Sequence, residues 1–121
     1  MPVKKILVVD DSPTERFVFQ ELLTQKGFTV VLAETGEEGV AKAAKELPDL
    51  ILMDVVMPGL NGFQATRQIS RAPETAHIPI FMCTTKDQET DKVWGQRQGA
   101  KDYLVKPVNG DELLAKIAAL G

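Results

Sequence analysis

The chain has 121 residues, 44% of them hydrophobic and 26% charged, which is typical of a soluble globular protein. Its length suits one domain with a hydrophobic core, and we expect a single domain over residues 1–121 with no output domain. The net charge of −3 and the lack of a basic run argue against nucleic-acid binding, and the lone cysteine, Cys83, rules out an internal disulfide. We find no signal-peptide pattern and no bilayer-spanning run, so we expect a cytoplasmic protein without membrane insertion.

The first part of the chain predicts two strand–helix units. Residues 5–9 and 28–33 are short apolar runs, which are typical of buried strands. Ser12 and Thr35 can each cap a following helix, and Pro48 stops the second one. The apolar positions that we expect to face the core are Val18, Phe19, Leu22 and Leu23 in the first helix and Val40, Ala43, Ala44 and Leu47 in the second.

Three more units follow in the same alternation. The third strand runs Leu-Ile-Leu-Met over residues 50–53 and leads into Asp54, after which a Pro58–Gly59 turn redirects the backbone. The remaining strands are expected at residues 78–83 and 101–105, and the remaining helices at residues 61–71, at residues 87–98 and after Asn109. In the fourth helix the only sizeable apolar residues are Val93 and Trp94, so we expect this helix to dock weakly.

Strict alternation of strands and helices predicts an α/β fold. Each right-handed crossover returns the chain to the same edge, so the five strands form a parallel sheet with helices on both faces. Their near-continuous apolar character is what burial on both faces requires. We therefore expect a three-layer α/β/α sandwich of the flavodoxin-like (βα)5 type, with strand order 2-1-3-4-5.

Polar side chains follow four of the five apolar runs, where parallel strands bring them to one edge of the sheet. They are Asp10, Asp11, Asp54, Thr84 and Lys106. Three carboxylates in one cleft repel each other unless a cation holds them, and an all-oxygen cluster suits Mg²⁺, with Mn²⁺ as an alternative. A lysine and a hydroxyl beside them favour a tetrahedral dianion. The pattern therefore predicts that one carboxylate is a nucleophile that becomes an aspartyl phosphate.

These residues resemble the receiver domain of CheY-like response regulators in two-component signalling. The resemblance covers the whole chain, and it depends on the pair Asp10–Asp11, the acceptor segment of residues 53–59, Thr84, and Lys106–Pro107. It implies a phosphoprotein that is not a conventional enzyme. Its chemistry is limited to self-catalysed phosphoryl transfer and slow autodephosphorylation, and it takes its phosphoryl group from a histidine kinase of the CheA type.

The resemblance also implies a role for each residue of the cleft. Asp54 would be the phosphoacceptor. Asp11 and Asp54 would bind Mg²⁺ directly, with the backbone carbonyl of Val56 as the third protein ligand and Asp10 acting through water. Lys106 would contact a phosphoryl oxygen, and its bond to the following proline would be cis.

A conformational switch is implied as well. Thr84 would move to hydrogen-bond the phosphoryl group while Tyr103, the switch aromatic, turns inward. We expect the fourth helix, fifth strand and fifth helix to form the partner surface, with Trp94 and Tyr103 in it. For Trp94, ordinary core packing is an equal alternative.

Two positions depart from many chemotaxis-type receivers, which carry polar residues two places after the acceptor Asp and two places after the switch Thr. Here these positions hold Val56 and Lys86. The Val56 side chain cannot hydrogen-bond a hydrolytic water, so we hypothesise slow hydrolysis of the phosphorylated form. Thr85 stands where smaller residues are common and narrows access to the phosphate.

Within the family, residues 57–68 and 84–95 resemble the PilH-type regulators of the type IV pilus chemosensory system, which governs twitching motility. A phosphate sink for a shared kinase, a flagellar-chemotaxis receiver and a phosphate-independent scaffold are the alternatives. A flavodoxin would need a phosphate-cradling loop in place of Asp10–Asp11. A haloacid-dehalogenase-type phosphatase would need a second Asp where Ser12 stands.

Overall fold

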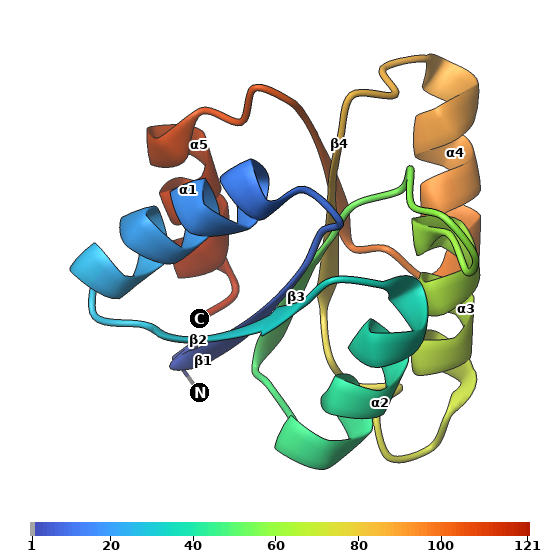
Figure 1. Ribbon diagram of the computed structural model, residues 1–121, viewed down its shortest axis with the longest axis horizontal. Helices are drawn as coiled ribbons and strands as arrows, with labels where there is room; N and C mark the ends of the chain where they lie inside the picture. The colour runs from blue at the N-terminus through green and yellow to red at the C-terminus, as the bar shows by residue number, and fades with distance from the viewer. Residues whose placement is uncertain (1) are drawn as a thin grey trace.

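The computed structural model describes residues 2–121 and shows strands and helices in strict alternation (Figure 1). The elements are β1 (Lys5–Val9), α1 (Pro13–Gln25), β2 (Thr29–Ala33), α2 (Gly36–Glu46), β3 (Leu50–Met53), α3 (Gly62–Arg71), β4 (Ile80–Thr84), α4 (Glu89–Gln98), β5 (Asp102–Val105) and α5 (Gly110–Ala119). The strands form one sheet in the order β2-β1-β3-β4-β5, and all neighbouring pairs are parallel. The predicted fold class and strand order are therefore confirmed.

Helices cover both faces of the sheet. In Figure 1, α1 and α5 lie together on one side, and α2, α3 and α4 lie on the other. The first core layer packs Phe19 and Leu23 of α1 with Leu113 of α5 against strand residues such as Leu52. The second layer packs α2 and α3 against the opposite faces of the same strands. Residues that alternate along each strand thus serve two cores, which explains why the strand sequences are continuously apolar.

The register of the parallel strands brings their carboxyl ends together. Val9 lies beside Met53, and Thr84 lies beside Val105. The ladder continues one residue beyond β1 and β3, because the Asp54 amide donates to the Val9 carbonyl at 2.9 Å. The polar residues that follow these strands therefore start from one edge of the sheet.

Three of the expected core positions, Val18, Ala44 and Leu47, are exposed. Val18 of α1 is 54% exposed, because the face that packs on the sheet is centred on Phe19 and Leu23. In α2 the buried residues are Gly36, Gly39 and Ala43. The face that packs on the sheet is therefore rotated relative to the expected one, and Ala44 is exposed. A Cβ at Gly39 would lie 2.9 Å from both Val9 methyl groups, so this glycine allows the helix to approach β1 closely.

Leu47 also departs from its expected role. It lies beyond the end of α2, is 53% exposed and has the left-handed conformation with φ of 45°. The residue before a proline disfavours the right-handed helical region, so the helix cannot continue through Leu47 into Pro48. Elsewhere the expected boundaries hold to within two residues. The fourth strand begins at Ile80 rather than residue 78, because Pro79 has no amide hydrogen to donate to a neighbouring strand.

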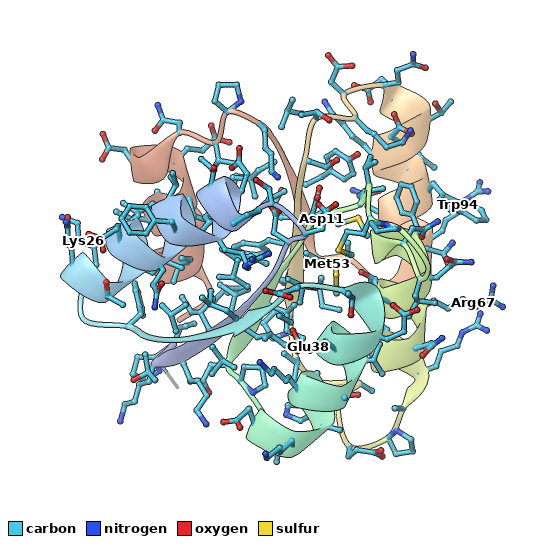
Figure 2. The ribbon with its side chains drawn as sticks, in the orientation of Figure 1. Asp11, Lys26, Glu38, Met53, Arg67 and Trp94 are labelled. Carbon is cyan, nitrogen blue, oxygen red and sulfur yellow. The ribbon has the colours of Figure 1, made fainter. Side chains whose placement is uncertain are left out.

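Helix α4 makes little apolar contact with the sheet. Val93 and Trp94 are 45% and 47% exposed, and the one buried residue of the helix is Gly95. Figure 2 shows Trp94 pointing away from the sheet, so Trp94 is not a core residue. Within residues 2–121, none of the helices combines the length and the apolar character that crossing a bilayer requires.

Candidate functional site

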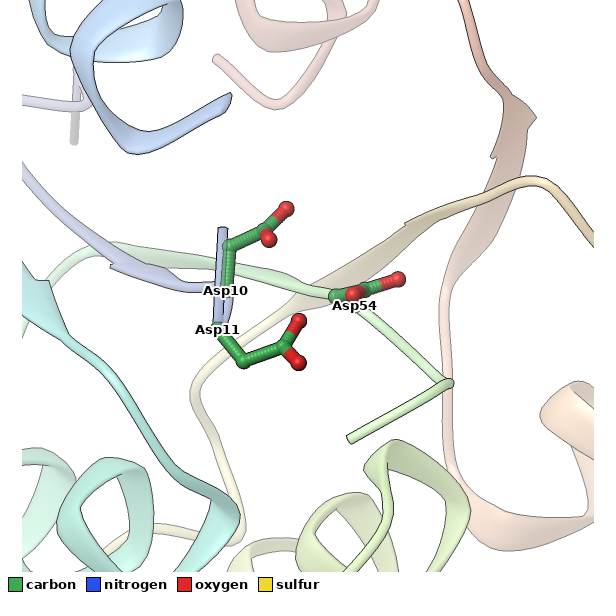
Figure 3. A group of neighbouring side chains, drawn as sticks. All are labelled: Asp10, Asp11 and Asp54. Carbon is green, nitrogen blue, oxygen red and sulfur yellow. The ribbon is translucent and has the colours of Figure 1, made fainter. Parts of the chain in front are cut away.

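Three carboxylates meet at the carboxyl edge of the sheet. Asp10 and Asp11 follow β1, Asp54 follows β3, and a carboxylate oxygen of each lies within 4.8 Å of one from the others. Figure 3 shows the three carboxyl groups projecting to the same side of the chain. Asp10 and Asp54 are buried whereas Asp11 is exposed. Oxygen ligands that leave several positions open are the chemistry that Mg²⁺ prefers, so this donor set fits the predicted ion.

Lys106 supplies a positive charge to the cluster from the end of β5. Its ammonium nitrogen lies 2.7 Å from Asp10 Oδ2 and 3.8 Å from Asp54 Oδ1, and only 10% of its side chain is exposed. Burial opposes the charged form of this lysine. The hydrogen bond to Asp10 and the charge of Asp54 nevertheless raise the pKa of Lys106. The Lys106–Pro107 peptide bond is cis, as the resemblance implied.

The carboxylate of Asp10 is already fully engaged by the protein. Its Oδ1 accepts a hydrogen bond from the Ser12 amide at 2.9 Å, and its Oδ2 accepts one from Lys106. Within residues 2–121, no hydrogen bond or ion pair restrains the carboxylate of Asp11, and Asp54 accepts only the Val55 amide at 2.9 Å. Oxygens free to bind a cation therefore come from Asp11 and Asp54.

Asp54 is an unusually weak acid in this setting. Burial, and then the negative charge of Asp10, raise its pKa to about 6, although the nearby Lys106 ammonium lowers it. In the absence of a cation, a part of the Asp54 population is consequently protonated near neutral pH. A bound cation would favour the ionised form, which is the form that can act as a nucleophile.

Thr84 and Tyr103 are linked through the backbone of Lys86. The buried Thr84 hydroxyl accepts a hydrogen bond from the Lys86 amide at 3.3 Å, and the Tyr103 hydroxyl donates to the Lys86 carbonyl at 2.8 Å. Burial raises the pKa of the Tyr103 hydroxyl to about 12. Within residues 2–121, no hydrogen bond joins the Thr84 side chain to the acid cluster. The two expected switch residues thus share one connecting residue.

The three residues expected to tune the rate lie at the rim of the site. Val56 is 58% exposed, and Thr85 and Lys86 are also exposed. Val56 and Lys86 come from different loops but line one groove of about 370 Å³, together with Val55, Met57, Asn61 and Phe63. The Lys86 ammonium also lies 3.9 Å from Asp91 in the first turn of α4. The groove runs along the β3–α3 loop directly after Asp54, and Asp54 itself is not part of its lining.

Two charged residues of α1 contribute to the site but were not expected there. Glu15 Oε2 lies 4.0 Å from the Lys106 ammonium, and Arg16 donates to the Asp10 carbonyl at 2.7 Å. Both follow Ser12, which caps the helix by accepting the Glu15 amide. That cap fixes which residues of the first helical turn face the sheet edge. It is the sequence signal from which the contacts of Glu15 and Arg16 with the site could have been predicted.

Comparisons with known proteins agree with this geometry. The family model for the response regulator receiver domain matches residues 6–118. Protein PilH of Pseudomonas aeruginosa is 59% identical over 116 residues and covers 96% of both chains, which confirms the PilH-type resemblance.

Solved structures show the same fold. The chemotaxis protein CheY4 of Vibrio cholerae is 34% identical with a TM-score of 0.91, covering 98% of this chain and 99% of that one. The receiver domain of a sensor histidine kinase from Pseudomonas aeruginosa PAO1 is 32% identical with a TM-score of 0.87, covering 95% and 94% of the two chains. That domain has a magnesium ion coordinated in its active-site cleft. By the family match, the PilH likeness and the acid cluster, the chain belongs to the response regulator receiver domain family, whose members are partners of histidine kinases rather than conventional enzymes.

Proposed function

We propose that this chain is a response-regulator receiver in the cytoplasm that accepts a phosphoryl group on Asp54 and then signals by binding another protein. The observation that carries the proposal is the placement of Asp54: it is recessed, 3.8 Å from the Lys106 ammonium and in one carboxylate cluster with Asp10 and Asp11. A CheA-type histidine kinase is the proposed donor. The similarity to PilH supports a place in type IV pilus twitching motility.

The proposed reaction is a phosphoryl transfer from a kinase phosphohistidine. An Asp54 carboxylate oxygen forms the new bond to phosphorus while the phosphorus–nitrogen bond breaks, and the imidazole keeps the electron pair and takes up a proton. The Lys106 ammonium then moves from Asp10 towards a phosphoryl oxygen and stabilises its negative charge. The movement is short, because its ammonium already lies between the two carboxylates.

The proposed ion site uses the oxygens that the protein leaves free. Asp11 and Asp54 would hold Mg²⁺ or Mn²⁺, with the Val56 carbonyl as the third ligand and Asp10 acting through water. The bound ion supplies positive charge opposite the phosphoryl oxygens. The magnesium in the related kinase receiver domain supports this assignment.

The proposed switch runs through Lys86. If the Thr84 hydroxyl turns to the phosphoryl group, the Lys86 amide loses its acceptor at Thr84 and the loop before α4 is released. The Lys86 carbonyl, which accepts the Tyr103 hydroxyl, must then shift as well. The chemical event at Asp54 is thereby coupled to the environment of Tyr103.

The proposed partner surface comprises α4, β5 and α5. Its largest exposed apolar side chain is Trp94, which is 47% exposed and follows Val93, which is 45% exposed. An apolar pair on an otherwise polar helix is the composition of a binding anchor rather than of a solvent face. Tyr103 of β5 is half-buried at the inner edge of this surface.

Phosphorylation is tested by incubating the chain with acetyl phosphate and MgCl₂ and measuring intact mass. We expect a gain of one phosphoryl group that needs Mg²⁺ and that Asp54→Asn abolishes. Asp11→Asn, which keeps the acceptor but loses an ion ligand, should slow the gain strongly. Failure of the wild-type chain to gain mass, or a gain that survives Asp54→Asn, would overturn the proposal.

The donor is tested separately with a panel of purified histidine kinases carrying ³²P-phosphohistidine. We expect the fastest transfer from a CheA-type kinase of a pilus system, with slower transfer from flagellar-type kinases. Equal rates across the panel would contradict the assignment to one pathway and leave the phosphoacceptor role unaffected.

A further inference from the structure

Arg16 lies almost buried beside the acid cluster, which is unusual for an arginine. Only 13% of its side chain is exposed, although the residue belongs to the first turns of α1. Burying a guanidinium is costly unless its donors are paired. Its Nη1 donates to the Asp10 backbone carbonyl at 2.7 Å, and its Nη2 donates to Glu34 Oε1 at 3.2 Å. The first of these bonds is the shorter one and the more buried one.

The bond to the Asp10 carbonyl acts on the next residue. That carbonyl belongs to the planar peptide unit that joins Asp10 to Asp11, so fixing the oxygen fixes the plane from which Asp11 extends. The amide of Asp10 is held as well, since it donates to the Ala33 carbonyl at 3.1 Å. The carboxylate of Asp11 has no such restraint of its own within residues 2–121, so its direction depends on that backbone.

Building on the proposed ion site, we propose that Arg16 is a positioning residue for divalent-cation binding, acting through the Asp10–Asp11 peptide plane on the Asp11 carboxylate. Removing a residue that orients a metal ligand without itself binding the metal lowers metal affinity by about 10-fold or more. The guanidinium suits this role because its planar fork donates in a fixed direction. The Glu34 contact is secondary, because Glu34 is 70% exposed and a solvated ion pair contributes little.

The test is isothermal titration calorimetry of MgCl₂ into the 121-residue chain, without any phosphodonor. Arg16→Met keeps the aliphatic stem and removes every donor. We expect it to weaken Mg²⁺ binding about 10-fold. Arg16→Lys, which offers a single mobile donor, should fall between wild type and Arg16→Met. The matched control is Glu34→Gln, which removes the surface charge pair but leaves the bond to the Asp10 carbonyl, and its Mg²⁺ affinity should equal that of wild type.

A second readout separates positioning from general destabilisation. At saturating Mg²⁺, the rate of phosphorylation of Arg16→Met by acetyl phosphate should return close to that of wild type, whereas it should be several-fold lower at limiting Mg²⁺. If Arg16→Met does not fold in EDTA by circular dichroism, the comparison of Arg16→Lys with Glu34→Gln decides. Unchanged Mg²⁺ affinity in both Arg16 variants would overturn the inference, as would an equal loss in Glu34→Gln. A wild-type chain that does not bind Mg²⁺ would overturn the proposed ion site itself.

Discussion

Lys106 and Asp10 are 96 residues apart in the sequence, yet the lysine ammonium lies 2.7 Å from an Asp10 carboxylate oxygen. This bond spans the edge of the sheet from the end of β5 to the end of β1. It leaves the ammonium within 3.8 Å of the proposed acceptor, Asp54. The Lys106 ammonium, the proposed ligand of the phosphoryl group, is therefore hydrogen-bonded to Asp10 and not to Asp54.

Removing the Lys106 ammonium should destabilise the folded chain. Lys106→Met leaves two buried carboxylates without their positive partner, and we expect a loss of about 3 kcal/mol in the free energy of unfolding. Lys106→Arg keeps the charge and should lose less. Urea denaturation at pH 7.5 in EDTA measures both. Equal stability of Lys106→Met and wild type would show that the ion pair has no net effect on folding.

The raised pKa of Asp54 predicts a specific pH dependence. The folded chain binds the Asp54 proton with a pKa of about 6, against an ordinary value of 3.8 in the unfolded chain. The resulting stabilisation is complete below pH 3.8 and is lost as the pH rises through 6. Asp54→Asn escapes this loss, so in EDTA it should be more stable than wild type by about 2–3 kcal/mol at pH 8, with little difference near pH 4. A gain of the same size at both pH values would contradict the assignment.

Gly95 sets the distance between α4 and the sheet. A Cβ at this position would lie 2.9 Å from Met82 Sδ and 3.2 Å from Tyr103 Cδ2. We expect Gly95→Ala to lower the free energy of unfolding by about 1 kcal/mol, because overpacking outweighs the better helix propensity of alanine. It should also shift the NMR resonances of the Tyr103 ring. Gly110→Ala is the matched control, since its nearest neighbours are Leu22 methyl groups at 3.4–3.5 Å, an ordinary contact.

Val56 is predicted to slow the loss of the phosphoryl group. Its exposed apolar side chain lies two residues after Asp54 and offers a hydrolytic water no hydrogen bond. Val56→Asn should therefore shorten the half-life of the phosphorylated chain several-fold, measured by intact mass after removal of acetyl phosphate. Val18→Asn changes an equally exposed valine of α1 and should leave the half-life unchanged. An unchanged half-life in Val56→Asn would contradict the hypothesis that Val56 slows hydrolysis.

The sheet and its acid cluster could be predicted from the sequence because both follow from local patterns and one rule of topology. Apolar runs of four to six residues identified the strands, and parallel pairing then required Asp10, Asp54 and Lys106 to share an edge. No distances were needed for that step. The expected cis bond after Lys106 came from family resemblance alone and is present.

The helix faces were harder to predict because glycine has no side chain and so does not contribute to an apolar stripe. Gly36 and Gly39 place α2 so close to its neighbours that they define the buried face, and Leu47 is left outside it. The contributions of Glu15 and Arg16 were missed for a related reason. Charged residues on a helix are usually solvated, and only the three-dimensional path of α1 shows that these two turn towards the acids.

Gly62 indicates the direction in which a phosphorylation signal can leave the site. It begins α3 directly against the backbone of Asp54, its amide donates to the Val55 carbonyl at 2.9 Å, and Asn61 and Gln64 close a reciprocal cap around it. The backbone after Asp54 and the start of α3 are thus held tightly together. Residues 85–90, which follow β4 at the same edge of the sheet, are all exposed. We therefore expect a displacement that starts at Asp54 to pass towards α4 rather than α3, and a ligand that immobilises residues 85–90 to block signalling while leaving phosphorylation of Asp54 unchanged.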